Sequence, residues 1–156
     1  MNTWFHYLLF PFSVLYRFII IFRNFCYDKK LIKTNELPCD IISIGNISFG
    51  GTGKTPTVLY LCRVLQENKK NDIAILSRGY KRNTSGTVLV SSGNGPLKNW
   101  QAVGDEPFMM AQKTKNIPIV VDSNRYRGGK FLIKNFNSKI IILDDGFQHR
   151  SLSRDL

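Results

Sequence analysis

The sequence is short of acidic residues and lacks the cysteine patterns of disulfide-rich or zinc-binding proteins. Its 156 residues include 22 lysines and arginines against 11 aspartates and glutamates, for a net charge of +11. The three cysteines, Cys26, Cys39 and Cys62, form no CxxC pair, which argues against a disulfide framework or a zinc site and favours a reducing compartment. The positive charge indicates an anionic partner, which nucleic acid, a nucleotide or an anionic membrane would each satisfy.

Several familiar binding motifs are also missing. No G-x-G-x-x-G occurs, so a dinucleotide-binding Rossmann domain has no support. The guanine-binding Asn-Lys-x-Asp pattern fails at its acid in residues 68–71, and the basic-aromatic signature of RNA-binding sheets is absent. We therefore expect no nucleic-acid partner. An apolar content of 43% is enough to build the core of one domain.

The N-terminal segment has neither acidic residues nor an uninterrupted apolar run. No Asp or Glu occurs from Trp4 to Tyr27. A membrane-spanning helix needs about 20 apolar residues, whereas Pro11, Ser13 and Arg17 interrupt this run. A basic start and a small-residue cleavage site, which mark a secretory signal, are missing as well.

Helical spacing places the few polar side chains of this segment, Ser13, Arg17 and Asn24, on one narrow stripe. The wide remaining face carries Phe12, Leu15, Phe18, Ile19 and Phe22, and Arg23, Lys29, Lys30 and Lys33 follow. The pattern predicts a hydrophobic, amphipathic helix within residues 1–33 that lies in the interface of an anionic membrane. The alternative is a helix packed on the domain's own core or on a partner.

Residues 38–156 alternate short apolar runs with longer mixed segments, which predicts an α/β domain with a mostly parallel sheet and flanking helices. The expected strands are 40–44, 73–77, 117–121 and 140–143, and the expected helices are 54–67, about 105–113 and about 125–135. Residues 87–90 lie between Ser- and Gly-rich turns and are expected to form a surface strand or hairpin outside the core. Four strands would leave an exposed edge, so the chain is expected to be incomplete.

A glycine-rich turn follows the first of these strands directly. Residues 48–55 read Ser-Phe-Gly-Gly-Thr-Gly-Lys-Thr, and the order of strand, loop and helix start is that of a P-loop. Backbone N–H groups can wrap a phosphate chain only where glycine allows a close approach, which Gly50, Gly51 and Gly53 provide. Lys54 would contact the β- and γ-phosphates and the Thr55 hydroxyl would bind Mg²⁺. The alternative is a flexible turn before a helix, because Ser48 replaces the first glycine of the pattern.

Carboxylates occur at two other positions where a strand or helix boundary is expected. Asp144 and Asp145 follow an apolar strand and could hold Mg²⁺ opposite Thr55, although such a strand followed by Asp-Asp-Gly is often only a turn. Asp105 and Glu106 stand at a probable helix start. Asp105 could accept the proton of an attacking hydroxyl, or it could simply cap the helix.

Two further groups could reach the same cleft. Arg78 belongs to a basic loop at a strand end that could meet phosphates or an anionic substrate, or could be merely solvated. His149 and its neighbour Gln148 follow the aspartate pair closely. A lone surface histidine is the alternative there.

Four motifs in this order resemble those of the tetraacyldisaccharide 4'-kinase family. They are Gly45–Pro56, Ser77–Tyr80, Gly104–Pro107 and Asp144–His149. That family phosphorylates the lipid A precursor at the inner membrane of Gram-negative bacteria, and it too has Ser or Thr at the position of Ser48. The resemblance implies a P-loop fold, ATP and Mg²⁺ as cofactors, and an acylated disaccharide as substrate. It also implies peripheral attachment to the cytoplasmic face of the membrane.

The resemblance also implies roles for individual residues. Thr55, Asp144 and Asp145 would serve the metal, and Asp105 would be the base for the 4'-hydroxyl. Gln148 and His149 would lie at the active site. The loop and the helix start together would bind ATP, through Ser48, Phe49, Gly50, Gly51, Thr52, Gly53, Lys54 and Thr55.

The family is about twice as long and continues into a second α/β region, so the resemblance predicts a truncated chain. Two alternatives stay open from the sequence. One is a nucleotide-binding fragment of such a kinase without turnover, and the other is a P-loop kinase with another substrate.

Overall fold

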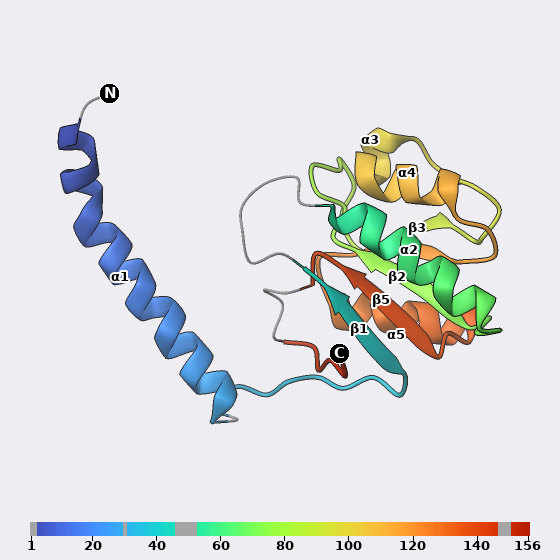
Figure 1. Cartoon of the computed structure of the whole chain (residues 1–156), viewed down its shortest axis with the longest axis horizontal. Helices are drawn as coiled ribbons and strands as arrows, with labels where there is room; N and C mark the ends of the chain where they lie inside the picture. Colours follow the sequence, from blue (N-terminus) through green and yellow to red (C-terminus); the bar gives the residue numbers. More distant parts are fainter. Residues whose placement is uncertain (1–2, 30, 46–52, 147–150) are drawn as a thin grey trace. The chain divides into compact units, whose positions relative to one another are not determined.

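The computed structural model describes residues 3–29, 31–45, 53–146 and 151–156 (Figure 1). The chain divides into two compact units, Met1–Thr34 and Asn35–Leu156. The first unit contains helix α1 (Thr3–Asp28). The second contains the sheet and the other helices.

Helix α1 is long and carries exposed apolar side chains over much of its described surface. It runs for 26 residues with Pro11 inside it, and the Ser13 hydroxyl donates a 2.7 Å hydrogen bond to the Phe10 carbonyl. The large exposed side chains include Phe10, Phe12, Leu15, Tyr16, Phe18, Ile19, Ile21 and Phe22. Over the described parts of the chain, no helix combines the length and apolarity needed to cross a bilayer. The predicted hydrophobic helix is confirmed, and its contact with a membrane stays a prediction.

The second unit is built on one five-stranded sheet in the order β1-β5-β2-β4-β3. The strands are β1 (Asp40–Ile44), β2 (Ile73–Ser77), β3 (Val88–Ser91), β4 (Ile119–Val121) and β5 (Ile140–Asp144). Strands β1, β5, β2 and β4 run parallel, and β3 pairs antiparallel with β4. The predicted mostly parallel sheet is therefore confirmed. Parallel strands bring their carboxyl ends to one edge of the sheet, where ligands of such folds bind.

Helices cover both faces of this sheet (Figure 1). They are α2 (Lys54–Glu67), α3 (Trp100–Val103), α4 (Asp105–Lys113) and α5 (Arg125–Phe136). Side chains alternate between the faces of a strand, so Ile73 and Ile75 pack with α2 and α4 while Ala74 and Leu76 pack with α5. The helices starting at residues 54, 105 and 125 were predicted. The short helix α3, which Asn99 caps by accepting from the Ala102 N–H at 3.0 Å, was not.

Strand β3 corrects the expectation for residues 87–90. Val90 and Ser91 are fully buried, and Val90 belongs to the core beside α2 and α4, so the segment is an edge strand of the main sheet and not an insertion outside the core. The Ser- and Gly-rich turns on either side suggested a surface insertion, but they are the connections through which the chain enters and leaves the edge of the sheet. Gly93, at φ 110°, approaches Asn116 so closely that a Cβ there would lie 3.0 Å from the Asn116 Cα.

The outer edge of β1 is partly paired. The Ser43 N–H donates to the Leu156 carbonyl at 2.8 Å, and the Leu156 N–H donates to the Ile41 carbonyl at 3.2 Å, which is a parallel pairing pattern. The Asp155 carboxylate also accepts from the Ile41 N–H at 2.8 Å.

A buried carboxylate ties the connection before β3 to the start of α5. Asp122 has no exposed surface. It accepts two 2.8 Å hydrogen bonds from the Arg127 guanidinium and one of 2.8 Å from the Asn124 N–H, and the Thr87 hydroxyl donates to it as well. Burial acts to raise the pKa of Asp122, but the hydrogen bonds from Arg127 and Thr87 lower it by more, so the net shift is downward.

We expect Asp122→Asn to lower the free energy of unfolding by about 2 kcal/mol at neutral pH, because the amide cannot satisfy donors arranged around a carboxylate. A carboxylate with a lowered pKa stabilises the fold above its unfolded pKa of about 4, and this contribution is lost as pH falls through the folded pKa. The deficit of the variant should therefore shrink on acidification below about pH 4. Urea unfolding of the variant and the wild type, followed by circular dichroism at neutral pH and below about pH 4, measures this difference in the free energy of unfolding.

Asp72→Asn is the matched control. Asp72 pairs with Lys139 at 3.1 Å, the Lys139 side chain is exposed and that of Asp72 is about half exposed, so its replacement should change the free energy of unfolding by no more than about 0.5 kcal/mol. Equal losses in the two variants would contradict the role given to the buried carboxylate.

Candidate functional site

The glycine-rich loop leads into α2, whose first residues carry two of the predicted site side chains. Gly53 precedes the helix at φ 77°, a left-handed conformation that glycine adopts without strain. Lys54 begins the helix and Thr55 is buried. The N-cap residue Gly53 has no side chain to cap the helix, and a helix N-terminus attracts anions through its N–H groups and its dipole.

Part of the predicted site lies outside the described residues. Of the eight residues expected to bind ATP, the structure describes Gly53, Lys54 and Thr55. The ATP-binding roles of the other five stay predictions, and these residues are Ser48, Phe49, Gly50, Gly51 and Thr52. The predicted active-site residues Gln148 and His149 also lie outside the described ranges.

The two aspartates at the carboxyl end of β5 have different surroundings. Asp144 is 1% exposed, and one of its oxygens accepts a 3.0 Å hydrogen bond from the Ser77 hydroxyl at the end of β2. Burial raises the pKa of Asp144, although the Ser77 hydrogen bond opposes the shift. Asp145 is exposed and lies in the left-handed region at φ 55°. Asp144 thus belongs to the floor of the site and Asp145 to its rim.

Lys54 and Asp145 form an ion pair across the site. The Lys54 Nζ lies 2.6 Å from a carboxylate oxygen of Asp145. This hydrogen bond is the main cause that raises the pKa of Lys54, and the negative charges of Asp144 and Glu106 act in the same direction. The P-loop lysine and the two aspartates, which are far apart in the sequence, therefore meet at the carboxyl edge of the sheet.

The start of α4 brings two more carboxylates to this edge. Gly104 occupies the N-cap position and Asp105 is the first residue of the helix, so the capping alternative for Asp105 is wrong. Partial burial raises the pKa of Glu106, and the charge of Asp144 raises it further. The charges of the site thus act on the Glu106 carboxylate, and Asp105 precedes Glu106 in the first turn of the same helix.

A buried arginine that the sequence analysis missed lies behind these groups. Arg125 is 2% exposed and donates to the Asp122 carbonyl at 2.6 Å and to the Asp144 carbonyl at 3.4 Å. Burial lowers the pKa of Arg125 to about 10, and the charge of Arg78 acts in the same direction. The predicted Arg78 is exposed, and its influence on Arg125 places it near the site. The sequence signal that could have identified Arg125 is its position as the first residue of a helix that follows a strand.

Three buried polar atoms in the described ranges have no hydrogen-bond partner, and two of them belong to this region. They are one carboxylate oxygen of Asp144, the Arg125 Nε and the Ser43 hydroxyl. Ser43 lies opposite Leu143 in the register of β1 and β5, so its side chain is on the other face of the sheet from that of Asp144. Buried polar groups normally have partners. The unpaired oxygen of Asp144 therefore indicates that a water molecule or an ion completes the site.

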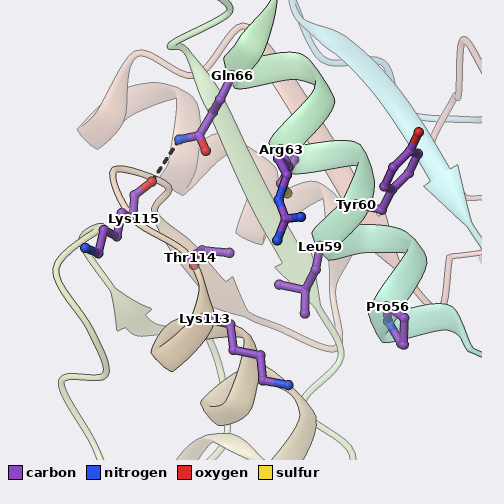
Figure 2. Close-up of a pocket in the computed structure, with 9 residues that line it drawn as sticks. Pro56, Leu59, Tyr60, Arg63, Gln66, Lys113, Thr114 and Lys115 are labelled. Atoms are coloured by element: carbon purple, nitrogen blue, oxygen red, sulfur yellow. Dashed lines mark hydrogen bonds between the residues drawn. The ribbon is translucent and has the colours of Figure 1, made fainter.

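An open groove of about 610 Å³ lies elsewhere, between α2 and the end of α4 (Figure 2). Its lining includes Leu59, Tyr60, Arg63 and Lys113, and the Gln66 side chain crosses it to the Lys115 carbonyl at 2.8 Å. None of the converging charged groups described above lines it. We therefore place the candidate site at the carboxyl edge of the sheet and not in this groove.

A mostly parallel sheet whose first strand is followed in the sequence by a glycine-rich segment and then by a lysine-bearing helix, with acidic residues ending a neighbouring strand, is typical of the P-loop class of nucleotide-binding proteins. Within that class, residues 5–156 match the family model described as tetraacyldisaccharide-1-P 4'-kinase. The chain belongs to this family.

Individual relatives agree with the family model. The tetraacyldisaccharide 4'-kinase of Aquifex aeolicus is 46% identical over 95% of this chain, and that of Flavobacterium psychrophilum is 46% identical over 92%. A crystal structure of LpxK from Aquifex aeolicus in complex with ATP matches with a TM-score of 0.87 over 95% of this chain. The chain spans 46% of the length of the Aquifex protein and 40% of the Flavobacterium protein.

Proposed function

We propose that this chain is the nucleotide-binding part of an ATP-dependent lipid kinase that phosphorylates the 4'-hydroxyl of a tetraacyldisaccharide 1-phosphate in lipid A biosynthesis. The observation that carries the proposal is the meeting of Lys54 with Asp144 and Asp145, at the end of a glycine-rich loop. Membership of a family of such kinases and an ATP complex of a relative support the donor and the acceptor.

The side chains divide the chemistry between them. Lys54 would place its ammonium on the β- and γ-phosphates, and the start of α2 would add its N–H groups. The substrate hydroxyl oxygen forms a bond to the γ-phosphorus while the bond from that phosphorus to the β–γ bridging oxygen breaks, so ADP leaves. The hydroxyl proton passes to the Asp105 carboxylate. His149 and Gln148 would contact the reacting groups, and Arg78 and Glu106 the substrate or its phosphates.

The described residues fit a magnesium ion. The unpaired buried oxygen of Asp144 and the hydroxyl of Thr55 would hold it, with Asp145 at the rim. Mg²⁺ would neutralise charge that develops on the phosphates. No three His, Cys, Asp or Glu side chains cluster as a metal site within the described ranges, which suits a cation that keeps several waters and is held by one or two carboxylates plus phosphates.

We expect Asp144→Asn to abolish the tightening of ATP binding by Mg²⁺, because the carboxylate that would hold the ion is lost. The carboxylate is buried and only half satisfied, and burial raises its pKa, so its charge lowers the stability of the metal-free fold at neutral pH. The same charge also favours the charged form of the buried Arg125 guanidinium, so the unfolding free energy of the variant should stay within about 1 kcal/mol of that of the wild type. Titration of a fluorescent ATP analogue with and without Mg²⁺, beside thermal unfolding, measures both; retained Mg²⁺ dependence would contradict the assignment.

The test of the function uses this chain with ATP, Mg²⁺ and the tetraacyldisaccharide 1-phosphate. Formation of the 4'-phosphorylated product supports the proposal. Binding of ATP without product would favour the second candidate, a nucleotide-binding fragment of such a kinase without turnover. Phosphorylation of a soluble sugar in preference to the lipid would instead favour a P-loop kinase with another substrate.

We also propose a place for the protein in the cell. The acceptor in the proposed reaction is a lipid, and α1 offers the exposed apolar side chains of an interfacial helix. Peripheral attachment to the cytoplasmic face of the inner membrane of a Gram-negative bacterium would bring the enzyme, its lipid substrate and cytoplasmic ATP together.

A further inference from the structure

A second stretch of the chain is free of acidic residues, and it lies in the sheet-containing unit. No Asp or Glu occurs between Asp72 and Asp105. The same stretch contains the cations Arg78, Lys81, Arg82 and Lys98. A segment with charges of one sign only is expected to attract an anionic partner.

Two parts of this stretch lie side by side. The Asn83 N–H donates to the Gln101 carbonyl at 2.8 Å, and a Cβ on Gly104 would lie 3.0 Å from the Tyr80 carbonyl oxygen. The connection after β2 is therefore packed against α3, which forms one margin of the unit in Figure 1. Tyr80 and Trp100 thus stand on adjacent segments.

These segments expose large side chains to solvent. Tyr80 is 65% exposed, Leu97 58% and Trp100 55%. The Lys81 ammonium lies 5.3 Å from the centre of the Tyr80 ring, and Lys98 is exposed next to Leu97. We call these five residues the aromatic edge. Arg82 is not part of it, because its guanidinium donates to the carbonyls of Val121 and Gly86.

The aromatic edge borders the candidate site. Tyr80 lies three positions after Ser77 in the sequence. The Ser77 hydroxyl donates to the buried Asp144 carboxylate. Trp100 lies in α3, which ends directly before Gly104 and the start of α4 at Asp105. A partner bound to the edge would therefore lie beside the carboxylates of the site.

We propose that the aromatic edge is a second lipid-contacting surface, which inserts Tyr80, Leu97 and Trp100 among the headgroups of an anionic bilayer. Tyrosine and tryptophan favour this depth because one end of each ring system is apolar and the other polar. Lysines near the surface of an anionic membrane each strengthen binding about fivefold, and no carboxylate on these segments opposes them. This contact with lipid would not require phosphoryl transfer by the chain.

Trp100 itself can report the contact. The chain has two tryptophans, so Trp4→Phe leaves Trp100 as the single emitter in the otherwise intact chain. With vesicles of equal parts phosphatidylcholine and phosphatidylglycerol, we expect its emission to shift to shorter wavelength and to be quenched by lipids that carry a nitroxide near the headgroup. Unchanged emission from chain that cosediments with the vesicles would overturn the proposal.

A pair of charge reversals tests the role of the lysines. Lys81→Glu with Lys98→Glu should reduce the quenching of Trp100 by about tenfold or more at a given lipid concentration, since two charges that attract the anionic lipid become repulsive. Lys69→Glu with Lys70→Glu is the matched control. It makes the same change in net charge just before the amino end of β2. Each pair also includes one lysine in the left-handed region, Lys69 at φ 59° in the control and Lys81 at φ 58° in the test pair.

The control pair should leave Trp100 quenching within about twofold of the unaltered reporter chain if the contact is local. Equal losses in the two pairs would indicate general attraction by net charge and would overturn the assignment. Addition of single-stranded polyuridylate provides the other arm. A shift of Trp100 emission with the RNA but not with vesicles would assign the aromatic edge to nucleic acid and likewise overturn the proposal, and neither readout depends on kinase activity.

Discussion

Lys54→Ala is expected to weaken binding of ATP by at least tenfold and to lower any phosphoryl transfer by roughly 10²–10³-fold, the range seen when one group that stabilises a developing charge is removed. The physical reason is the position of the ammonium. It lies at the start of α2 and contacts Asp145 at 2.6 Å, so it is already held where phosphate oxygens would meet a helix N-terminus. Titration with a fluorescent ATP analogue measures the first effect, and transfer of labelled phosphate to the disaccharide measures the second.

The loss should not come from unfolding. The side chains of Lys54 and Asp145, which form the ion pair, are both partly exposed. Such pairs contribute no more than about 1 kcal/mol to stability. Thermal unfolding of the variant should therefore stay close to that of the wild type. Lys69→Ala, at an exposed position just after α2, serves as the control and should bind ATP normally. Undiminished ATP binding by Lys54→Ala would refute the site.

Deleting residues 1–27 is expected to release most of the protein from anionic vesicles. The described part of α1 exposes large apolar side chains, Phe12, Phe18 and Phe22 among them, and full burial of one such side chain contributes about 1.5–3 kcal/mol. Even partial insertion of several of them should therefore account for a partition coefficient at least about a hundredfold above that of the deletion variant. Flotation through a density gradient measures the partition.

A point variant covers the case in which the deletion disturbs folding. Phe18→Ser with Phe22→Ser keeps the whole chain and should lower partitioning in the same direction, whereas Ser13→Ala, on the polar stripe, should leave it unchanged or slightly higher. Partitioning that is unchanged by both the deletion and the double variant would favour the alternative of a hydrophobic helix packed on protein.

The parts of the fold that were predictable are those determined by local pattern. The bounds of β1, β2 and α2 agree with the sequence expectation, because apolar runs flanked by polar residues and a Gly-Lys-Thr helix start are visible within a few residues. Strand β3 depended on pairing with β4, which lies about thirty residues further along the chain. Nothing in residues 87–91 alone distinguishes an edge strand from a surface hairpin, since both are short and flanked by turns.

The candidate site shows the same division. Lys54, Thr55 and the two aspartates could be identified because motif spacing identifies them. The Ser77 hydroxyl and the Arg125 guanidinium could not be assigned roles, because both acquire them only when the ends of separate strands converge on Asp144. The burial of an arginine is a property of the folded chain, and its residue type alone predicts exposure.

The ion pair between Lys54 and Asp145 has a consequence for how ligands would bind together. The two charges of the pair neutralise each other, so a nucleotide that binds the lysine leaves the aspartate without its counter-charge. A cation that occupies the aspartate frees the lysine in the same way. Each ligand would therefore lower the cost of binding the other, and the coupling would be equal in both directions. Nucleotide and cation affinities measured separately would then underestimate the affinity for the two together, and the thermodynamic cycle of four binding constants would measure the difference.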